Sequence, residues 1–169
     1  MDIAYYPGCS LRASAELYDS QNKKVFETLG IHLKEIADWN CCGATSAGKI
    51  NDFLAVAMPA RNLGIAEATG LSEMVIPCSA CYSRTLVAQT HLKNNAELRA
   101  DINEELSAKV QGTIKVSSIL ETLLTTVESG ELKGKVSRKL KGLKPVCYYG
   151  CILTRFPIDV PVPDNVENP

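Results

Sequence analysis

The chain has 169 residues, of which 46% are hydrophobic and 22% charged, and its formal net charge is −1. This length is typical of a single domain, the apolar content excludes an intrinsically disordered protein, and the balanced charge gives no reason to expect nucleic acid as a partner. No apolar run reaches the ~18 residues of a membrane span, and the amino terminus lacks the basic and apolar parts of a secretory signal, which predicts a cytoplasmic protein.

Strand-like and helical patterns alternate from the start of the chain. A β-prone segment covers residues 2–6, and apolar spacing predicts a helix over residues 14–29. A second strand is expected over residues 31–36. Residues 51–69 have helical character, and Pro59 either kinks this helix or begins a second one.

The alternation continues through the second half. A strand is predicted over residues 73–76, a helix over 78–94, a strand over 113–116 and a helix over 118–127. Between them, apolar residues four apart predict an amphipathic helix: Leu98, Ile102, Leu106 and Val110. This order indicates an α/β domain with a largely parallel sheet flanked by helices.

Seven cysteines are the most informative feature of the composition. Clustered thiols in a cytosolic chain point to metal or redox chemistry, not to a disulfide scaffold. Sites in parallel sheets collect in loops at the carboxyl ends of strands. Five of the cysteines directly follow a predicted strand: Cys9, Cys41, Cys42, Cys78 and Cys81. We therefore expect a multi-thiol metal site in these loops.

The spacing of the five cysteines limits the kind of site. Five thiols are one more than a tetrahedral zinc or a cubane [4Fe–4S] cluster requires. Cys41 and Cys42 would point apart on a strand, so their convergence requires a turn, which Gly43 allows. Cys78 and Cys81 share one face of a helix start, where the positive end of the helix dipole favours thiolates.

Three sequence segments resemble the cysteine-rich CCG domain found in the B-type subunit of heterodisulfide reductase and in its bacterial relatives. They are residues 5–9 (YYPGC), 38–47 (DWNCCGATSA) and 77–82 (PCSACY), and the resemblance extends over the whole chain. It implies one noncubane [4Fe–4S] cluster, and the ligands that it implies are Cys9, Cys41, Cys42, Cys78 and Cys81.

The same resemblance implies an oxidoreductase subunit that reduces a disulfide, of the CoM-S-S-CoB type or a bacterial equivalent, by one-electron steps. The implied partners are a ferredoxin-like iron–sulfur subunit, a flavin-containing subunit and a small thiol or disulfide substrate. Relatives with CCG domains also serve succinate, lactate and glycolate oxidation, so the motif does not fix the substrate.

An internal echo suggests a second repeat. Residues 4–12 are matched by residues 147–155, which again carry paired tyrosines, then Gly-Cys and a nearby arginine. We therefore divide the chain into a first CCG domain at 1–143 and, at 144–169, the start of a second repeat with a proline-rich tail. Cys151 would be the first ligand of a second site, whereas Cys147 is expected to be a buried strand residue.

Other interpretations remain open. Zinc could use four of the five thiols, Cys78 and Cys81 alone could act as a thioredoxin-like pair, or the thiols could be buried as small hydrophobes. The corresponding alternative function is a non-catalytic relay or structural module, with zinc or a single iron–sulfur cluster, in a respiratory or dehydrogenase complex. His32 and His91 are expected to be ordinary residues, and Trp39 to pack or to shield a cluster.

Residues 132–144 are strongly basic and contain no acidic residue. Such a run is commonly a solvated linker, although it could also be a docking surface for an acidic partner or for the anionic groups of a substrate. Its charged residues are Lys133, Lys135, Arg138, Lys139, Lys141 and Lys144.

Overall fold

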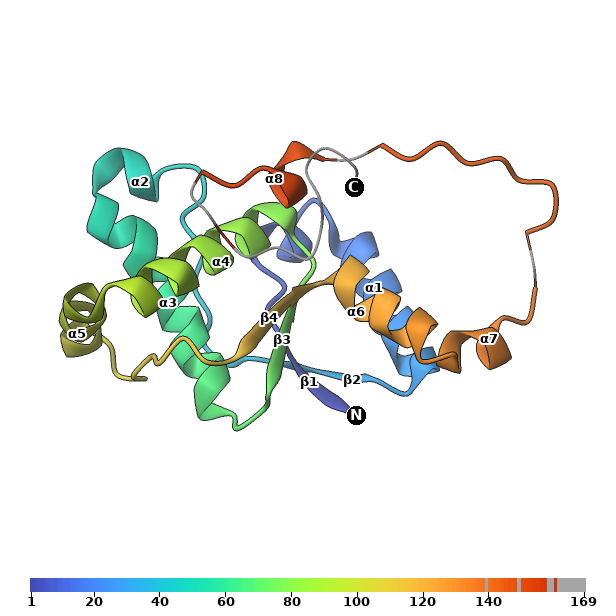
Figure 1. Cartoon of the computed structure of the whole chain (residues 1–169), viewed down its shortest axis with the longest axis horizontal. Helices are drawn as coiled ribbons and strands as arrows, with labels where there is room; N and C mark the ends of the chain where they lie inside the picture. Colours follow the sequence, from blue (N-terminus) through green and yellow to red (C-terminus); the bar gives the residue numbers. More distant parts are fainter. Residues whose placement is uncertain (139, 149, 158–159, 161–169) are drawn as a thin grey trace.

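The computed structural model describes residues 1–138, 140–148, 150–157 and 160. Its centre is a sheet of four parallel strands in the order β2-β1-β3-β4, with helices on both faces (Figure 1). The predicted α/β class with a parallel, helix-flanked sheet is therefore confirmed. The strands are β1 (Asp2–Tyr5), β2 (His32–Glu35), β3 (Glu73–Ile76) and β4 (Lys115–Ser118).

Helices form a layer on each face of the sheet. In Figure 1, α1 and α6 lie on one side of the strands, and α3 and α4, which pack against each other, lie on the opposite side. The main helices are α1 (Glu16–Leu29), α3 (Asp52–Ala68), α4 (Ser79–Asn94), α5 (Ala96–Glu105) and α6 (Ile119–Glu128). Shorter elements are η1 (Cys9–Arg12), α2 (Ala47–Ile50), α7 (Glu131–Lys135) and α8 (Cys151–Thr154).

The alternation of side chains along β1 divides the core into two halves. Ile3 and Tyr5 pack with Phe26 and the α1–α6 layer, whereas Ala4 and Tyr6 pack with the α3–α4 layer. Both sets are fully buried, as expected for a central parallel strand covered on two faces.

Local signals in the sequence explain several helix ends. Gly30 ends α1 in the left-handed region at φ 78°, which is a conformation that glycine adopts without steric cost. The Asn51 side chain accepts a hydrogen bond from the N–H of Phe53 at 2.7 Å and so caps α3. Ser118 and Glu121 form a capping box at the start of α6.

Two details of the predicted helices differ from the structure. α3 runs through Pro59 without a second start, so the alternative of two helices is wrong; burial of residues on both sides of Pro59 keeps the helix continuous. α5 ends at Glu105, because the Asn103 side chain pairs with both the N–H and the C=O of Val110 at 2.7 and 3.0 Å. Val110 therefore enters the core from a loop and not from a helix.

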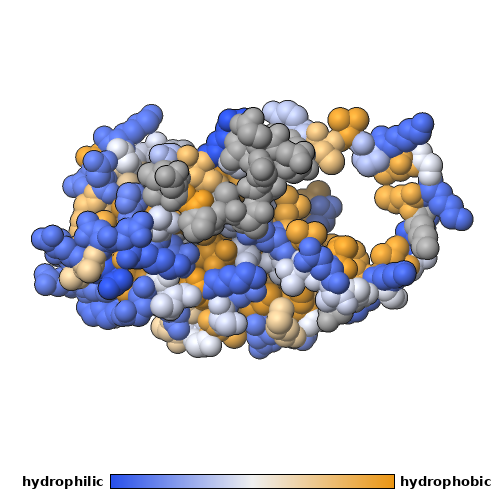
Figure 2. All heavy atoms as spheres, viewed as in Figure 1, coloured by the Kyte–Doolittle hydropathy of each residue, from blue (hydrophilic) through white to orange (hydrophobic). Residues whose placement is uncertain are grey.

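Residues 136–138 and 140–148 contain no helix or strand and form an arch beside the main body (Figure 1). Cys147 is exposed there, so its expected place in a buried strand is wrong; the segment lies away from the sheet and has no strand edge beside it. Figure 2 shows hydrophobic side chains interspersed with basic ones along this arch. Lys139, Tyr149 and residues 161–169 lie outside the described residues.

Candidate metal centre

The strand order brings the predicted ligands to one edge of the sheet. β1 lies between β2 and β3, so the chain moves outward in opposite directions from β1, and ligand sites form at such a switch point. Cys9 follows the carboxyl end of β1, and Cys78 follows that of β3. The Cys41-Cys42-Gly43 loop follows β2 at the same edge.

The five thiols interact in a continuous series. The Sγ atoms of Cys9 and Cys41 are 3.9 Å apart. The Cys42 thiol interacts with those of Cys41 and Cys81, and the Cys81 thiol also interacts with that of Cys78. The structure therefore brings together all five cysteines that the sequence singled out, although they come from three separate loops.

The series runs from the surface into the core. Cys9 and Cys41 are exposed and Cys78 is half-buried. Cys42 and Cys81, in contrast, are only 3% and 2% exposed. The centre thus has an open side formed by the first loop and the start of the second, and a closed side formed by α4 and the core.

Polar contacts stabilise the charged form of two of the thiols. The pKa of Cys78 is lowered to about 5, mainly by the Cys81 thiol and then by backbone N–H groups at the start of α4. The pKa of Cys42 is lowered to about 7, and the largest cause is again the Cys81 thiol. Because Cys81 interacts with both of these sulfurs and is buried, its own pKa is raised. Thiolates are the form that binds metals.

Gly8 allows the closest approach of backbone to the centre. Its backbone has φ 74° and ψ 168°, a combination that is essentially restricted to glycine. A Cβ atom at Gly8 would lie 2.7 Å from the Sγ of Cys81 and 4.0 Å from the Cβ of Cys78. The glycine therefore leaves the space in which the Cys81 sulfur lies.

A buried hydrogen-bond network fixes the loop that carries Cys41 and Cys42. The Asn62 side chain on α3 accepts from the N–H of Asn40 at 3.0 Å and donates to its C=O at 2.8 Å. The Tyr6 hydroxyl donates to the same carbonyl at 2.8 Å. The sequence did not predict that Asn62 and Tyr6 hold this loop. The one sign of such a role was Asn62, a polar residue within the apolar pattern of the expected helix 51–69.

Trp39 joins the same loop to β2 and the core. Its Nε1 donates to Glu35 at 3.0 Å, and its ring meets that of Tyr6 edge-on at 5.5 Å. The predicted packing role of Trp39 is confirmed, because its side chain lies against the main core cluster. Arg12 of η1 also pairs with Glu35, which connects the Cys9 turn to β2.

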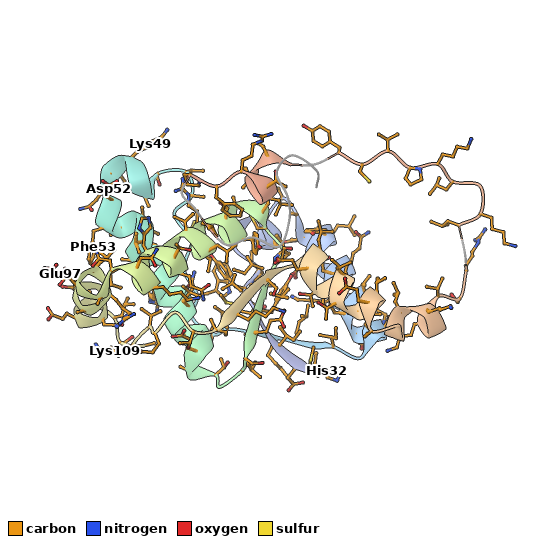
Figure 3. All side chains as sticks on the ribbon, in the orientation of Figure 1. His32, Lys49, Asp52, Phe53, Glu97 and Lys109 are labelled. Atoms are coloured by element: carbon orange, nitrogen blue, oxygen red, sulfur yellow. The ribbon has the colours of Figure 1, made fainter. Side chains whose placement is uncertain are left out.

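The remaining candidates lie apart from the five thiols. His32 is exposed at the first position of β2, the opposite end of that strand from the thiols, as Figure 3 shows near the lower edge of the molecule. His91 lies on α4 and lines a pocket. Cys151 is exposed at the first position of α8, and its thiol has no hydrogen-bond contact within the described residues.

The donor set of the centre consists of sulfur alone. Within the ranges described, no group of three or more His, Cys, Asp or Glu side chains is arranged to hold a metal ion. The five thiols form a series along the end of the sheet. All five donors are sulfur, which iron–sulfur clusters use as ligands.

The lengths and hydropathy of the helices bear on membrane insertion. In the described part of the chain, no helix is both long enough and apolar enough to cross a bilayer.

Comparison with known proteins agrees with the cysteine pattern. Residues 3–84 match the family described as CCG, cysteine-rich domain. The chain is 35% identical over 153 residues to an 8-methylmenaquinol:fumarate reductase membrane anchor subunit of Wolinella succinogenes, covering 89% of this chain and 52% of that protein. It is 26% identical over 157 residues to the B-type subunit of a ferredoxin/F(420)H(2)-dependent CoB-CoM heterodisulfide reductase of Methanosarcina acetivorans, covering 90% and 52%.

A third relative has the same character. The B-type subunit of the ferredoxin:CoB-CoM heterodisulfide reductase of Methanosarcina mazei is 24% identical over 157 residues, again with 52% of that protein covered. The chain thus spans about half the length of these curated relatives. Residues 3–84 of this chain thus match the CCG cysteine-rich domain, and its sequence is similar to the B-type subunits of heterodisulfide reductases.

Proposed function

We propose that the chain is an iron–sulfur electron-transfer subunit of an oxidoreductase complex and that it reduces a disulfide by one-electron steps. The observation that carries this proposal is the convergence of five thiols at the switch point of the sheet. The CCG match and the relatives named as reductase subunits support the iron–sulfur and redox character. The proposed cofactor is one noncubane [4Fe–4S] cluster, and its proposed ligands are Cys9, Cys41, Cys42, Cys78 and Cys81.

The overall reaction would consume two electrons and two protons for each disulfide and release two thiols. Such a cluster supplies single electrons to the sulfur atoms of a substrate. Contacts within the centre lower the pKa values of two proposed ligands, Cys42 and Cys78, and so favour their thiolate forms, whereas the pKa values of Cys41 and Cys81 are raised. The chain also excludes water from one side, because Cys42 and Cys81 are buried.

The open side of the centre is where a substrate or an electron donor would approach. Cys9 and Cys41 are exposed, whereas α4 and the core close the opposite side. We propose a ferredoxin-like iron–sulfur subunit and a flavin-containing subunit as partners, in the cytoplasm. Both Methanosarcina relatives are named as ferredoxin-linked enzymes, which is consistent with a ferredoxin-type donor.

The relative from Wolinella favours a second candidate. That protein is named as a membrane anchor subunit of a fumarate reductase, and it matches this chain at higher identity than the two Methanosarcina proteins do. A non-catalytic subunit that relays electrons in a respiratory complex would use the same centre. The two candidates differ in whether a disulfide is reduced at the thiols.

Metal analysis tests the centre itself. After strictly anaerobic purification, the chain should contain about four iron and four acid-labile sulfide, with an EPR signal that depends on oxidation state. Cys81→Ser should lose most of the iron, whereas Cys147→Ser, which changes an exposed cysteine of the arch, should keep it. About one zinc per chain without sulfide would refute the iron–sulfur proposal and support a zinc module.

Turnover separates the catalytic subunit from the relay. Once a cluster is present, the chain combined with a reduced ferredoxin-type donor and its partner subunits should reduce a disulfide, and Cys9→Ser should abolish this. We expect the chain alone to have little activity, because its seven cysteines supply only one set of five. An assembled complex that transfers electrons but leaves every disulfide offered intact would favour the relay.

A further inference from the structure

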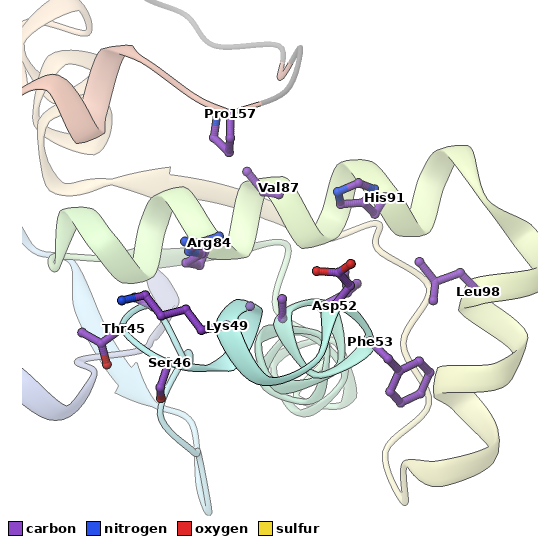
Figure 4. A pocket seen from close by; sticks show the side chains of 14 residues that line it. Thr45, Ser46, Lys49, Asp52, Phe53, Arg84, Val87, His91, Leu98 and Pro157 are labelled. Carbon is purple, nitrogen blue, oxygen red and sulfur yellow. The ribbon is translucent and has the colours of Figure 1, made fainter.

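A groove beside the thiols is formed by two adjoining pockets. The larger one, of about 690 Å³, lies between α4 and the segment that contains α2 and the start of α3 (Figure 4). The smaller one, of about 390 Å³, lies between α4 and α8. They share three lining residues, which are Ala44, Arg84 and Pro157. The larger volume is typical of sites for small molecules.

The groove begins next to the cysteine centre. Ala44 directly follows the Cys41-Cys42-Gly43 loop, and Ala80, which lines the smaller pocket, directly precedes Cys81. Arg84 lies three residues after Cys81 on α4, which places it one helical turn away, about 4.5 Å along the axis and on the same side. Neither pocket is lined by a cysteine, so a molecule held by Arg84 would lie beside the buried side of the centre, one helical turn from Cys81.

The charges that line the groove are mainly positive. Arg84 is half-buried and lines both pockets, Lys49 lines the larger one and Arg155 the smaller one. Asp52 supplies the single carboxylate among these lining residues. Across the described parts of the chain, the side chains of these three basic residues form neither an ion pair nor a hydrogen bond. A half-buried guanidinium in this position is available for a carboxylate, sulfonate or phosphate group.

The opposite part of the larger pocket holds most of its apolar side chains, with Asp52 and His91 beside them (Figure 4). Phe53 and Val56 of α3, Val87 of α4 and Leu98 of α5 line it. Figure 4 shows Phe53 and Leu98 at one end of the pocket and Arg84, Lys49 and Thr45 towards the other. A ligand that fits this division has an acidic group at one end and an apolar body.

We propose that this groove binds a small organic anion with an apolar body and that Arg84 is the main anchor for its acidic group. The inference goes beyond the proposed function, because the groove lies on the α4 side of the thiol centre and not on the open side at Cys9 and Cys41. Lys49 of α2 and Arg155, the residue directly after α8, add positive charge on either side of Arg84.

A matched pair of fluorescent probes tests the inference on the full chain. 1-Anilinonaphthalene-8-sulfonate carries a sulfonate on an aromatic body, whereas N-phenyl-1-naphthylamine has the same body without the charge. We expect Arg84→Gln to weaken binding of the sulfonate about tenfold or more, as expected for a lost hydrogen bond to a charged group. Lys49→Gln should weaken it by a smaller factor, and Arg84→Lys should restore part of the affinity.

Lys93→Gln is the control, because Lys93 is an exposed cation on the same helix that does not line either pocket. It should change the sulfonate affinity less than twofold. Thermal melting confirms that each variant is folded. The inference is wrong if Arg84→Gln binds the sulfonate as tightly as the parent chain does. It is also wrong if the two probes bind with equal affinity and Arg84→Gln changes neither affinity.

Iron and sulfide measured on the same samples keep this result separate from the proposed function. Arg84→Gln should retain the metal content of the parent chain, since Arg84 is not a proposed ligand. Loss of sulfonate binding with iron retained supports the groove. A parent chain that takes up neither iron nor sulfide on reconstitution but still binds the sulfonate through Arg84 would refute the iron–sulfur proposal but not the anion site.

Discussion

Replacing Gly8 with alanine is the sharpest test of how the thiol centre is built. Two costs are expected, and the structure separates them. The backbone at φ 74° and ψ 168° lies in a region where residues with a Cβ atom are strained by about 1–3 kcal/mol. The new methyl group would also lie 2.7 Å from the Sγ of Cys81, a sulfur that is buried and cannot easily move away.

Overpacking of this kind costs about 1–3 kcal/mol, while alanine regains about 0.4–1 kcal/mol by restricting the unfolded chain. The expected net loss in the free energy of unfolding is therefore about 3 kcal/mol. Gly70→Ala is a matched control, because Gly70 also has a positive φ, 73°, but a Cβ there would meet nothing within 4 Å. That variant should lose only about 1 kcal/mol.

The assay is anaerobic denaturant unfolding of the reduced, metal-free chains, followed by iron analysis after reconstitution. Gly8→Ala should be less stable than Gly70→Ala by about 2 kcal/mol, and its iron content should fall because the Cys81 sulfur is displaced. Equal stability of the two variants, together with full iron loading of Gly8→Ala, would show that Gly8 does not lie against Cys81 and would refute the reasoning.

Two further substitutions test the surroundings of the centre. Asn62→Ala removes both hydrogen bonds to the backbone of Asn40, so it should lower the free energy of unfolding by about 1–3 kcal/mol and reduce iron loading in reconstitution; unchanged loading would exclude a positioning role. Asp19→Asn should cost about 1.5–3 kcal/mol at neutral pH in denaturant titrations, because Asp19 accepts from Lys23 and Tyr5, each at 2.6 Å. Burial raises the pKa of Asp19, but these hydrogen bonds outweigh burial and hold the pKa below its ordinary value. The stability that Asp19 contributes is therefore present above about pH 4 and is lost as pH falls through the lowered pKa. The variant should therefore lose less stability than the parent chain between neutral and acidic pH, and a parallel loss would contradict the assignment.

The sequence was sufficient to predict the alternation of strands and helices and the position of the five thiols. Short β-prone segments such as residues 73–76 end at the positions where cysteines begin, and parallel strands place their carboxyl ends together. This explains why loops that start at Cys9, Cys41 and Cys78 could be assigned to one site.

Contacts between residues distant in sequence determine the features that local sequence patterns did not predict. Pro59 is compatible with a continuous α3 because residues before and after it are buried in the same layer. The end of α5 depends on the pairing of Asn103 with Val110, seven residues further along. The support that Asn62 gives to Asn40 joins positions 22 residues apart, and the polar residue in an apolar helical pattern does not by itself identify its partner.

The order of the strands has a consequence for biosynthesis. β1 ends at Tyr5, whereas β3, which pairs with it, begins at Glu73, so the sheet cannot close until much of the chain has been made. During translation, Cys9, Cys41 and Cys42 emerge before β3 and α4 exist to enclose them. For the proposed cluster, this means that the ligand set is complete only once β3 and the start of α4, which bring Cys78 and Cys81, have been made. Until then the early thiols are open to oxidation and to the wrong metals.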